Sequence, residues 1–301
     1  MAPFVETKAL RAFLPRLQAN LASRALQKTP AGVPPPRASV AAVFRWKEQQ
    51  QQTLEVLFIR RSFNERDTWS GQVAFPGGKR QKKAVETDSV EWETSLETAH
   101  RETLEEIGLD LTQPHVHWIG TLPPIQTHLR TFWVGTEVFF IDSSADKHAF
   151  TPVIQDSEIA NVFWVDLQEL YNPKRYQRLL WPVEGLVDQH PRLRSLVKRV
   201  LGELTFGSIY LPRPTHAPPD DDMSLRSRHD FILWGLTMRM LADICELAEL
   251  PLPDGDISPR FDKKQLGDLF LLLYRRPDQA IKPGLALAAL GAMALGLYSQ
   301  L

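Results

Sequence analysis

The sequence predicts an α+β fold in which helices cover both faces of a mixed β-sheet. Three observations support this prediction. Short runs rich in β-branched and aromatic residues recur through the first half of the chain, as strands require. One long helical pattern interrupts them, and the order of strands, helix, strands and helix is typical of a layered sandwich. Helical segments also stand before the first strand and after the last.

The N-terminal element is predicted to be an amphipathic helix over residues 6–27, where apolar residues recur at helical spacing. Pro15 is expected to kink this helix or to begin a second one. Several cations beside the single acid Glu6 are also typical of a mitochondrial presequence. A helix docked on the domain is the favoured interpretation. Glycine and prolines at residues 32–36 then break the chain.

The strands are predicted from alternating or continuous apolar runs bounded by turn residues. They cover residues 39–46, 54–60, 72–75, 117–122, 131–141 and 161–165. A glutamine-rich stretch joins the first two as a solvated connection, and Pro76, Gly77 and Gly78 end the third. A short helix over residues 167–171 follows the last of these strands.

The central helix is predicted between the third and fourth strands. Asp88 and Glu91 have the spacing of a capping box and should mark its start. Gly108 suits a left-handed C-terminal cap. Glu97 and Glu105 each lie four residues from Arg101 and are expected to hold its guanidinium group. The predicted buried stripe consists of Leu96, Ala99 or His100, Thr103 or Leu104, and Ile107.

The C-terminal third is mostly helical in pattern. Helices are predicted over residues 192–204, 230–250 and 261–275, with a strand at 205–211 and a polar, proline-rich loop at 212–228. The last segment, residues 283–301, has no charged side chain, but its apolar run is shorter than the roughly 18 residues that span a bilayer. A packed terminal helix is therefore favoured over a membrane tail anchor.

These elements divide the chain into three predicted parts. Residues 1–37 form an N-terminal helix and proline-rich linker, residues 38–185 form the core, and residues 186–301 form a mostly helical extension packed on it. The composition is that of an ordinary globular protein, with 43% apolar and 24% charged residues. A net charge of −1 gives no reason to expect nucleic-acid binding. The single cysteine, Cys245, excludes an intramolecular disulfide and is predicted to be a buried thiol in a reducing, intracellular compartment.

The chemistry is predicted at the end of the central helix. Glu102, Glu105 and Glu106 occupy two successive turns, so their carboxylates crowd one patch. Like charges at this spacing cost roughly 0.2–0.5 kcal/mol per pair, and the helix dipole disfavours anions at a C-terminus. Taken alone, the three glutamates also fit a charged surface helix. A hard divalent cation would make the arrangement favourable, because Mg²⁺ prefers carboxylate and phosphate oxygens.

This helix resembles the Nudix box, G-x5-E-x7-R-E-U-x-E-E-x-G-U, in which U is bulky and apolar. The matching residues are Glu93, Arg101, Glu102, Glu105, Glu106, Gly108 and Leu109. Thr103 stands where the box has an apolar residue, and Thr87 where it has its first glycine. The Gly77-Gly78 pair lies farther upstream, which indicates an insertion of about nine residues within residues 79–90, as loops tolerate. The resemblance implies a Nudix-type α/β/α sandwich.

The resemblance also implies a metal-dependent diphosphatase. Glu102, Glu105 and Glu106 would hold Mg²⁺ or Mn²⁺, and Glu105 or Glu106 would accept a proton from the attacking water. Arg101 would complete the catalytic set by orienting the carboxylates. Glu158 lies where such a fold often supplies one more acid from a loop, although a solvated loop acid is an equal alternative.

A second motif indicates the substrate. Arg61-Ser62, Arg66, Gly71 and Phe75-Pro76-Gly77-Gly78 resemble the motif upstream of the box in coenzyme A diphosphatases, and residues 232–237 resemble a helix start of that group. The implied reaction cleaves coenzyme A or its thioesters to 3′,5′-ADP and 4′-phosphopantetheine. The predicted substrate-binding residues are Arg61, Arg66, Gly77, Gly78, Lys79 and Arg80.

Two alternatives stay open at this point. One is a Nudix hydrolase of another nucleoside diphosphate derivative, such as ADP-ribose or a dinucleotide, and the other is a non-catalytic Nudix-like binding module. The expected partner is a small-molecule diphosphate, with no nucleic acid and no membrane, and a homodimer is left open. The chain ends in Ser299-Gln300-Leu301, a distant relative of the peroxisomal S-K-L signal. An intracellular location is expected, with mitochondrion, peroxisome and cytoplasm all left open.

Overall fold

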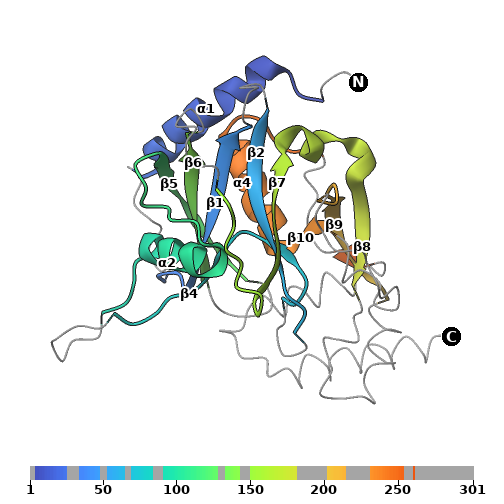
Figure 1. The fold of residues 1–301 in the computed structure, drawn as a ribbon. Helices are drawn as coiled ribbons and strands as arrows, with labels where there is room; N and C mark the ends of the chain where they lie inside the picture. The colour runs from blue at the N-terminus through green and yellow to red at the C-terminus, as the bar shows by residue number, and fades with distance from the viewer. Residues whose placement is uncertain are drawn as a thin grey trace, which may run out of the picture. The chain divides into compact units, whose positions relative to one another are not determined.

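A computed structural model gives the fold of the chain (Figure 1). It describes residues 4–25, 34–47, 53–64, 69–83, 91–127, 133–142, 150–181, 202–214, 231–253 and 260–261. The chain divides into two compact units. The first consists of Met1–Gln177 and Ser208–Gly255, and the second of Arg178–Gly207 and Asp256–Leu301. The predicted site residues all belong to the first unit.

Within the described residues, the first unit is built on a seven-stranded mixed sheet. Its strand order is β3-β2-β1-β6-β5, with β4 paired to β1 and β7 paired to β2. Strands β1 and β6 run parallel, and the other pairs are antiparallel. The strands are β1 (Ala38–Trp46), β2 (Leu54–Arg61), β3 (Val73–Ala74), β4 (Gly77–Lys79), β5 (Val116–Gln126), β6 (Trp133–Ile141) and β7 (Ile159–Asp166).

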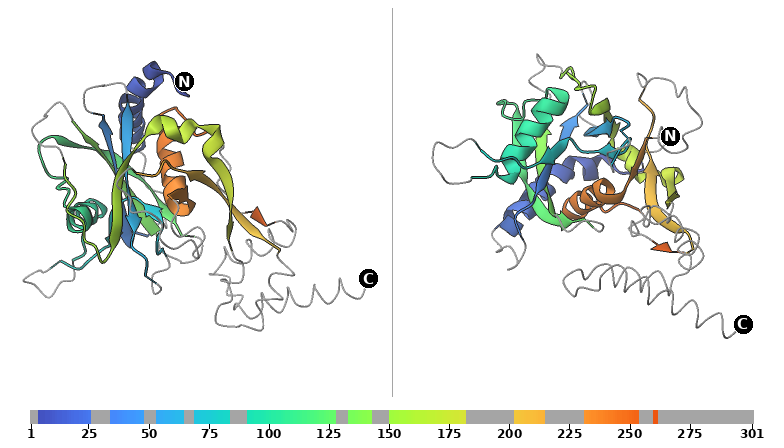
Figure 2. Two further views of the ribbon diagram at one scale, coloured as in Figure 1. Left: turned by 45° about the vertical axis from the view of Figure 1, so that its right-hand side comes forward. Right: turned by 90° about the horizontal axis from the view of Figure 1, so that it is seen from below.

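Helices cover both faces of this sheet (Figure 2). Helix α2 (Ser95–Ile107) packs on β1 and β6, where Ala99 and Ile107 join Val43 and Phe139 in one core cluster. Helices α1 (Thr7–Ala25) and α4 (Gly235–Leu247) lie on the other face. There the rings of Phe13 and Phe44 lie 5.5 Å apart. The side chains of neighbouring residues Val43 and Phe44 in β1 thus pack on opposite faces of the sheet, because side chains alternate along a strand. The predicted α+β sandwich is confirmed.

The remaining described elements are two 3₁₀ helices and four strands. They are the 3₁₀ helices η2 (Leu167–Tyr171) and η3 (Pro173–Arg175) and the strands β8 (Tyr176–Trp181), β9 (Leu204–Tyr210), β10 (Ile232–Trp234) and β11 (Arg260–Phe261). Cys245 is buried, as predicted. Among the described residues, no helix is long and apolar enough to cross a membrane. The predicted helix at 283–301, and nearly all of those at 192–204 and 261–275, lie outside the described residues.

The predicted start of the central helix was wrong. Helix α2 begins at Ser95, and its capping box is formed by Thr94 and Glu97 rather than by Asp88 and Glu91. Residues 91–93 are instead extended, because Trp92 forms an antiparallel bridge with Lys82. Two backbone hydrogen bonds flank this bridge, from Lys83 to Glu91 and from Glu93 to Gln81. The predicted C-terminal cap is confirmed, since Gly108 has φ +72°.

Other element predictions also needed correction. The helix expected from residue 230 begins at Gly235, whose φ of +62° separates it from β10; β10 is extended because it pairs with β9. Strand β5 continues beyond residue 122 through two prolines, which an edge strand with a bulge accommodates. Pro15 lies inside α1 and does not begin a second helix, which was one of the two expected outcomes. The Gly77-Gly78 pair was predicted to end the third strand, but it also begins a strand of its own, β4.

Candidate active site

Two glycines in β4 allow the chain to pass between β1 and helix α2. Gly77 has φ +147°, and a Cβ atom there would lie 2.3 Å from the carbonyl oxygen of Ser39. A Cβ atom on Gly78 would lie 2.5 Å from the carboxyl group of Glu102. Position 77 therefore requires glycine for its backbone conformation, whereas a side chain at position 78 would displace the Glu102 carboxyl group.

Glu106 is the most buried acid of the site, with 2% of its side chain exposed. Its Oε2 accepts a hydrogen bond from the Gly77 N–H at 2.8 Å, and its Oε1 lies 3.7 Å from Nη1 of Arg61. Burial raises the pKa of Glu106 to about 8, and the charges of Glu102 and Glu158 act in the same direction. Removal from water disfavours the charged form of a carboxylate. A cation beside Glu106 would oppose both effects.

Glu102 and Glu105 lie in different surroundings. Glu102 is half-buried, and burial raises its pKa, as do the charges of Glu105 and Glu158, whereas Arg101 lowers it. Glu105 is 52% exposed and forms an ion pair with Arg101. Residues 102 and 106 are four apart and share one face of the helix, while residue 105 is rotated away from residue 106 by about 100°. The structure therefore brings Glu102 and Glu106 to one place and turns Glu105 toward Arg101.

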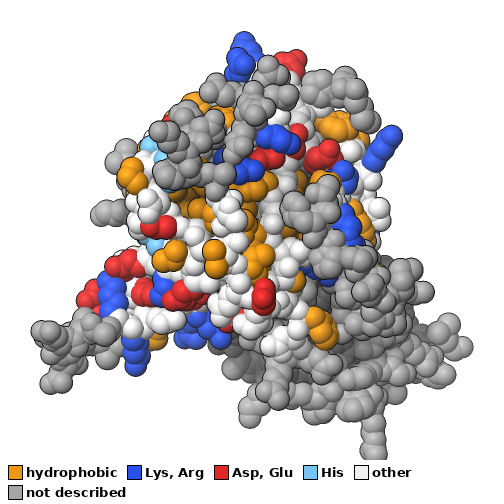
Figure 3. Space-filling model, viewed as in Figure 1, with side chains coloured by type: hydrophobic (Ala, Val, Ile, Leu, Met, Phe, Trp, Pro, Cys, Tyr) orange, Lys and Arg blue, Asp and Glu red, His pale blue; other side chains and the backbone are white. Residues whose placement is uncertain are grey.

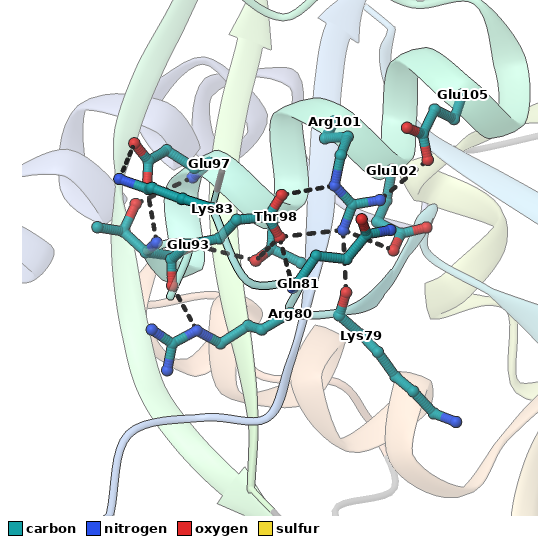
Figure 4. Close-up of polar contacts among 11 residues, drawn as sticks. Lys79, Arg80, Gln81, Lys83, Glu93, Glu97, Thr98, Arg101, Glu102 and Glu105 are labelled. Atoms are coloured by element: carbon teal, nitrogen blue, oxygen red, sulfur yellow. Dashed lines mark hydrogen bonds and ion pairs between the residues drawn. The ribbon is translucent and has the colours of Figure 1, made fainter. Parts of the chain in front are cut away.

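Arg101 is the centre of a polar network that fixes this end of the helix (Figure 4). Its Nε donates to Oε1 of Glu93 at 2.6 Å, and its Nη2 donates to Oε2 of Glu93 and to the carbonyl of Lys79. Nη2 also pairs with Glu102, and Nη1 pairs with Glu105, both at 2.9 Å. The pairing with Glu105 was predicted. The expected partner four residues earlier, Glu97, instead pairs with Lys83 at 2.8 Å.

Glu93 connects this network to the loop before the helix. Its Oε2 also accepts from the Gln81 N–H and from the hydroxyl of Thr98, and hydrogen bonds from Arg101 hold its pKa below the ordinary value. Its carbonyl accepts from Nε of Arg80. Sequence reasoning placed Glu93 in the box but gave it no role. The sequence contained a reason to assign it one. Glu93 is the acid of the Nudix box that lies apart from Glu102, Glu105 and Glu106, and it stands eight residues before Arg101, its partner.

The loop that carries Glu158 is tied to two elements of the site. Backbone N–H groups of Val153 and Gln155 donate to the carbonyls of Ile107 and Glu106, which the end of helix α2 leaves without intrahelical partners. The Ser62 N–H donates to the carbonyl of Glu158 at 2.7 Å. Glu158 itself is exposed. These bonds hold it close enough for its charge to act on Glu102 and Glu106.

The acids present suit a divalent cation. In the part of the chain that the structure describes, no three acidic, histidine or cysteine side chains form a ready-made metal site. Burial raises the pKa of both Glu102 and Glu106, and repulsion from the charge of Glu158 acts in the same direction on each of them. Oxygen donors of this kind are those that Mg²⁺ and Mn²⁺ prefer. A bound cation would relieve the repulsion, so the residues fit such an ion.

The cationic residues that were predicted to bind the substrate differ in their exposure and in their contacts. Arg61 lies beside Glu106, as described above. Lys79 is exposed, and Figure 4 shows its side chain directed away from Arg101. Arg80 donates to the carbonyls of Pro36 and Glu93, which indicates a role in holding the loop. Arg66 lies outside the described residues. On the face shown in Figure 3, acidic and basic side chains gather over helix α2 and the segment beside it.

Replacing Gly78 by alanine is expected to lower kcat about 100-fold while the protein stays folded. The new Cβ atom would displace the Glu102 carboxylate, and a small misplacement of an active-site group has an effect of this size. Gly235→Ala is the matched control. It adds backbone strain at φ +62° but has open space around the Cβ atom, so it should lower stability by about 1 kcal/mol and leave turnover unchanged. Steady-state kinetics and urea unfolding measure both effects. Full activity in Gly78→Ala would contradict this account of Glu102.

The family model described as NUDIX domain matches residues 35–183. The uncharacterized protein C14C4.10c of Schizosaccharomyces pombe is 29% identical over 242 residues, which covers 75% of this chain and 70% of that protein.

Three solved structures that match part of this chain are as follows. The NUDIX domain of Shewanella oneidensis NrtR complexed with ADP-ribose is 20% identical and covers 50% of this chain and 84% of its own, with a TM-score of 0.31. A C. elegans Ap4A hydrolase binary complex is 13% identical, with coverages of 54% and 93% and a TM-score of 0.31. A mutT/nudix family protein from Listeria innocua is 23% identical, with coverages of 46% and 82% and a TM-score of 0.29.

Proposed function

Because the chain carries a Nudix domain over residues 35–183 and is a hydrolase acting on diphosphates, we propose that its substrate is coenzyme A or a coenzyme A thioester. Cleavage of the diphosphate would yield 3′,5′-ADP and 4′-phosphopantetheine. The observation that carries this proposal is the contact between the second motif and the acids of the box. Arg61 lies 3.7 Å from Glu106, Gly77 donates to Glu106, and Gly78 adjoins Glu102.

The second motif therefore lines the place where a diphosphate would meet the metal. It is the part of the sequence that resembles coenzyme A diphosphatases, as opposed to Nudix proteins in general. Arginine suits a substrate that carries a 3′-phosphate in addition to its diphosphate, because the guanidinium fork matches phosphate oxygens. Exposed Lys79, next to the glycine pair, adds a second cation.

The proposed role of each residue follows from its surroundings in the structure. Glu102 and Glu106 would hold Mg²⁺ or Mn²⁺, with Glu105 and Glu158 as further acids. When bound, the ion would polarise the phosphoryl group and supply an activated water. Arg101 keeps Glu102 and Glu105 in place.

Two further roles concern proton transfer and charge. The proton of the attacking water would pass to a box glutamate, Glu105 or Glu106. Arg61 and Lys79 would neutralise phosphate charge.

A substrate panel tests the proposal. The full-length protein is incubated with coenzyme A, acetyl-coenzyme A, dephospho-coenzyme A, ADP-ribose, NADH and Ap4A in the presence of Mg²⁺ or Mn²⁺, and the products are separated by chromatography. Coenzyme A or its thioester should have the highest kcat/KM. Dephospho-coenzyme A, which lacks the 3′-phosphate, should be poorer by about tenfold or more, as expected for one lost hydrogen bond to a charged group. Preferred cleavage of ADP-ribose or a dinucleotide would overturn the substrate assignment.

A further inference from the structure

The side chain of Arg80 joins two main-chain segments that are far apart in the sequence. Its Nε donates to the carbonyl of Glu93, and its Nη1 donates to the carbonyl of Pro36 at 3.1 Å. The Arg80 N–H also donates to the carbonyl of Arg37 at 3.0 Å. Carbonyl acceptors carry no net charge, so these bonds fix the main chain and do not neutralise an acid. Arg80 therefore holds residues 36–37 and Glu93 in one arrangement.

Glu93 is held from two directions. From one side, the Glu93 N–H donates to the carbonyl of Gln81 at 3.0 Å, and Oε2 of Glu93 accepts from the Gln81 N–H at 2.9 Å. From the other side, Arg101 donates to both carboxylate oxygens of Glu93. Glu93 is only 9% exposed, so water cannot easily replace these partners. The main-chain position of Glu93 therefore determines where the guanidinium group of Arg101 lies.

Arg101 connects this arrangement to the acids of the site. Its Nη2 pairs with Glu102 and its Nη1 pairs with Glu105, each at 2.9 Å. Figure 4 shows the Arg80 side chain directed toward Glu93 and away from Glu102 and Glu105. A guanidinium group is a rigid planar fork, so a shift of Glu93 would turn it and move the carboxylates that it holds. Loss of a group that orients metal ligands typically lowers metal affinity or activity by about 10- to 100-fold.

We infer that Arg80 is a positioning residue, which acts on the metal site through Glu93 and Arg101 and not by contact with the substrate phosphate. The inference rests on the proposed function, in that Glu102 and Glu106 hold the divalent cation. The fork of Arg80 matters more than its charge, because two nitrogens of one guanidinium donate to two carbonyls at fixed positions. This role differs from the phosphate contact that the sequence suggested for Arg80.

Mn²⁺ binding in the absence of substrate tests this inference. Isothermal titration calorimetry is applied to the full-length wild type, to Arg80→Ala and to Arg80→Lys, and circular dichroism checks the fold of each. Arg80→Ala should bind Mn²⁺ about tenfold more weakly. Arg80→Lys should be weakened almost as much, because lysine keeps the charge but cannot serve both carbonyls. In a Glu93→Gln background, Arg80→Ala should weaken binding by less than about twofold, since its effect passes through Glu93.

Lys83→Ala serves as the control from the same loop. Lys83 forms ion pairs with Glu91 and Glu97, at 3.0 and 2.8 Å, and these pairs do not involve Arg101. The variant loses two contacts of the loop but leaves the route from Arg80 to the metal site intact. Its Mn²⁺ affinity should therefore equal that of the wild type. Equal weakening of Mn²⁺ binding in Lys83→Ala and Arg80→Ala would contradict a specific role for Arg80.

Wild-type Mn²⁺ affinity in Arg80→Ala would overturn the inference, and a raised KM for the diphosphate substrate in that variant would assign Arg80 to phosphate binding instead. A full tenfold loss in the Glu93→Gln background would exclude action through Glu93. Absence of Mn²⁺ binding by the wild type would overturn the proposed metal ligands together with the inference. A wrong substrate assignment would leave the Mn²⁺ measurements unchanged, so the two failures can be told apart.

Discussion

Replacing Glu106 by glutamine is expected to lower kcat about 1000-fold and to leave the protein folded. The glutamine has nearly the same shape, and its carbonyl oxygen can still accept the Gly77 N–H. It lacks the negative charge that would hold a divalent cation, and loss of one preorganised electrostatic group typically has an effect of this size. Turnover is measured with the best substrate of the panel at saturating Mg²⁺.

The stability of Glu106→Gln should equal or exceed that of the wild type when metal is absent. Burial raises the pKa of Glu106 to about 8, above its value in the unfolded chain. At any pH above the unfolded pKa, the ionised carboxylate of the unfolded chain is therefore disfavoured in the folded state, and this lowers the stability of the fold. Removing that charge thus stabilises the metal-free protein at neutral pH. Glu55→Gln, which alters a buried acid outside the site, should lose stability and keep its activity. A folded Glu106→Gln protein with full turnover would exclude Glu106 from catalysis.

Replacing Arg101 by methionine is expected to cost about 3 kcal/mol of unfolding free energy and most of the activity. Methionine keeps an unbranched stem of good helix propensity, so the loss is that of the guanidinium. Glu93, 9% exposed, would be left without its cation, and breaking one side of a buried pair has a cost of this order. Glu102 and Glu105 would lose the group that positions them. Urea unfolding and kinetics measure the two losses.

A double-mutant cycle with Glu93→Gln isolates the contact itself. If the pair carries the effect, the double variant should be little less stable than Arg101→Met alone. The pH dependence gives a second check. Arg101 lowers the pKa of Glu93 in the folded state. The pair therefore stabilises the fold at any pH above the pKa that Glu93 has in the unfolded chain, and this stabilisation is lost as the pH falls through the lower pKa of the folded state. Arg101→Met should therefore lose less stability on acidification than the wild type. Additive losses in the cycle would contradict a direct coupling.

Much of the site was predictable because it is local in sequence. Residues four apart on a helix share a face, so the joint position of Glu102 and Glu106 follows from spacing alone. Glu105 was predicted in the same patch; its charge does act on Glu102, but its side chain is half exposed and pairs with Arg101. Gly108 as a left-handed cap and Glu105 as a partner of Arg101 are local features of the same kind, and the structure confirms both.

The parts that sequence reasoning missed depend on contacts between distant segments. The start of helix α2 is set by the bridge between Lys82 and Trp92, across the inserted residues, and no local pattern reveals that pairing. The position of Glu158 depends on hydrogen bonds to the last carbonyls of α2 and to Ser62. Strand β4 exists because Gly77 can lie against β1 with no side chain in the way. These features required the assembled sheet.

The central claim is that Glu102 and Glu106 together hold a divalent cation beside the glycine pair. Anomalous X-ray scattering from crystals soaked in Mn²⁺ tests it most directly. The account predicts one strong peak about 2.1 Å from a carboxylate oxygen of each of these two glutamates. A peak bound to other side chains, with Glu102 and Glu106 both uncoordinated, would contradict it.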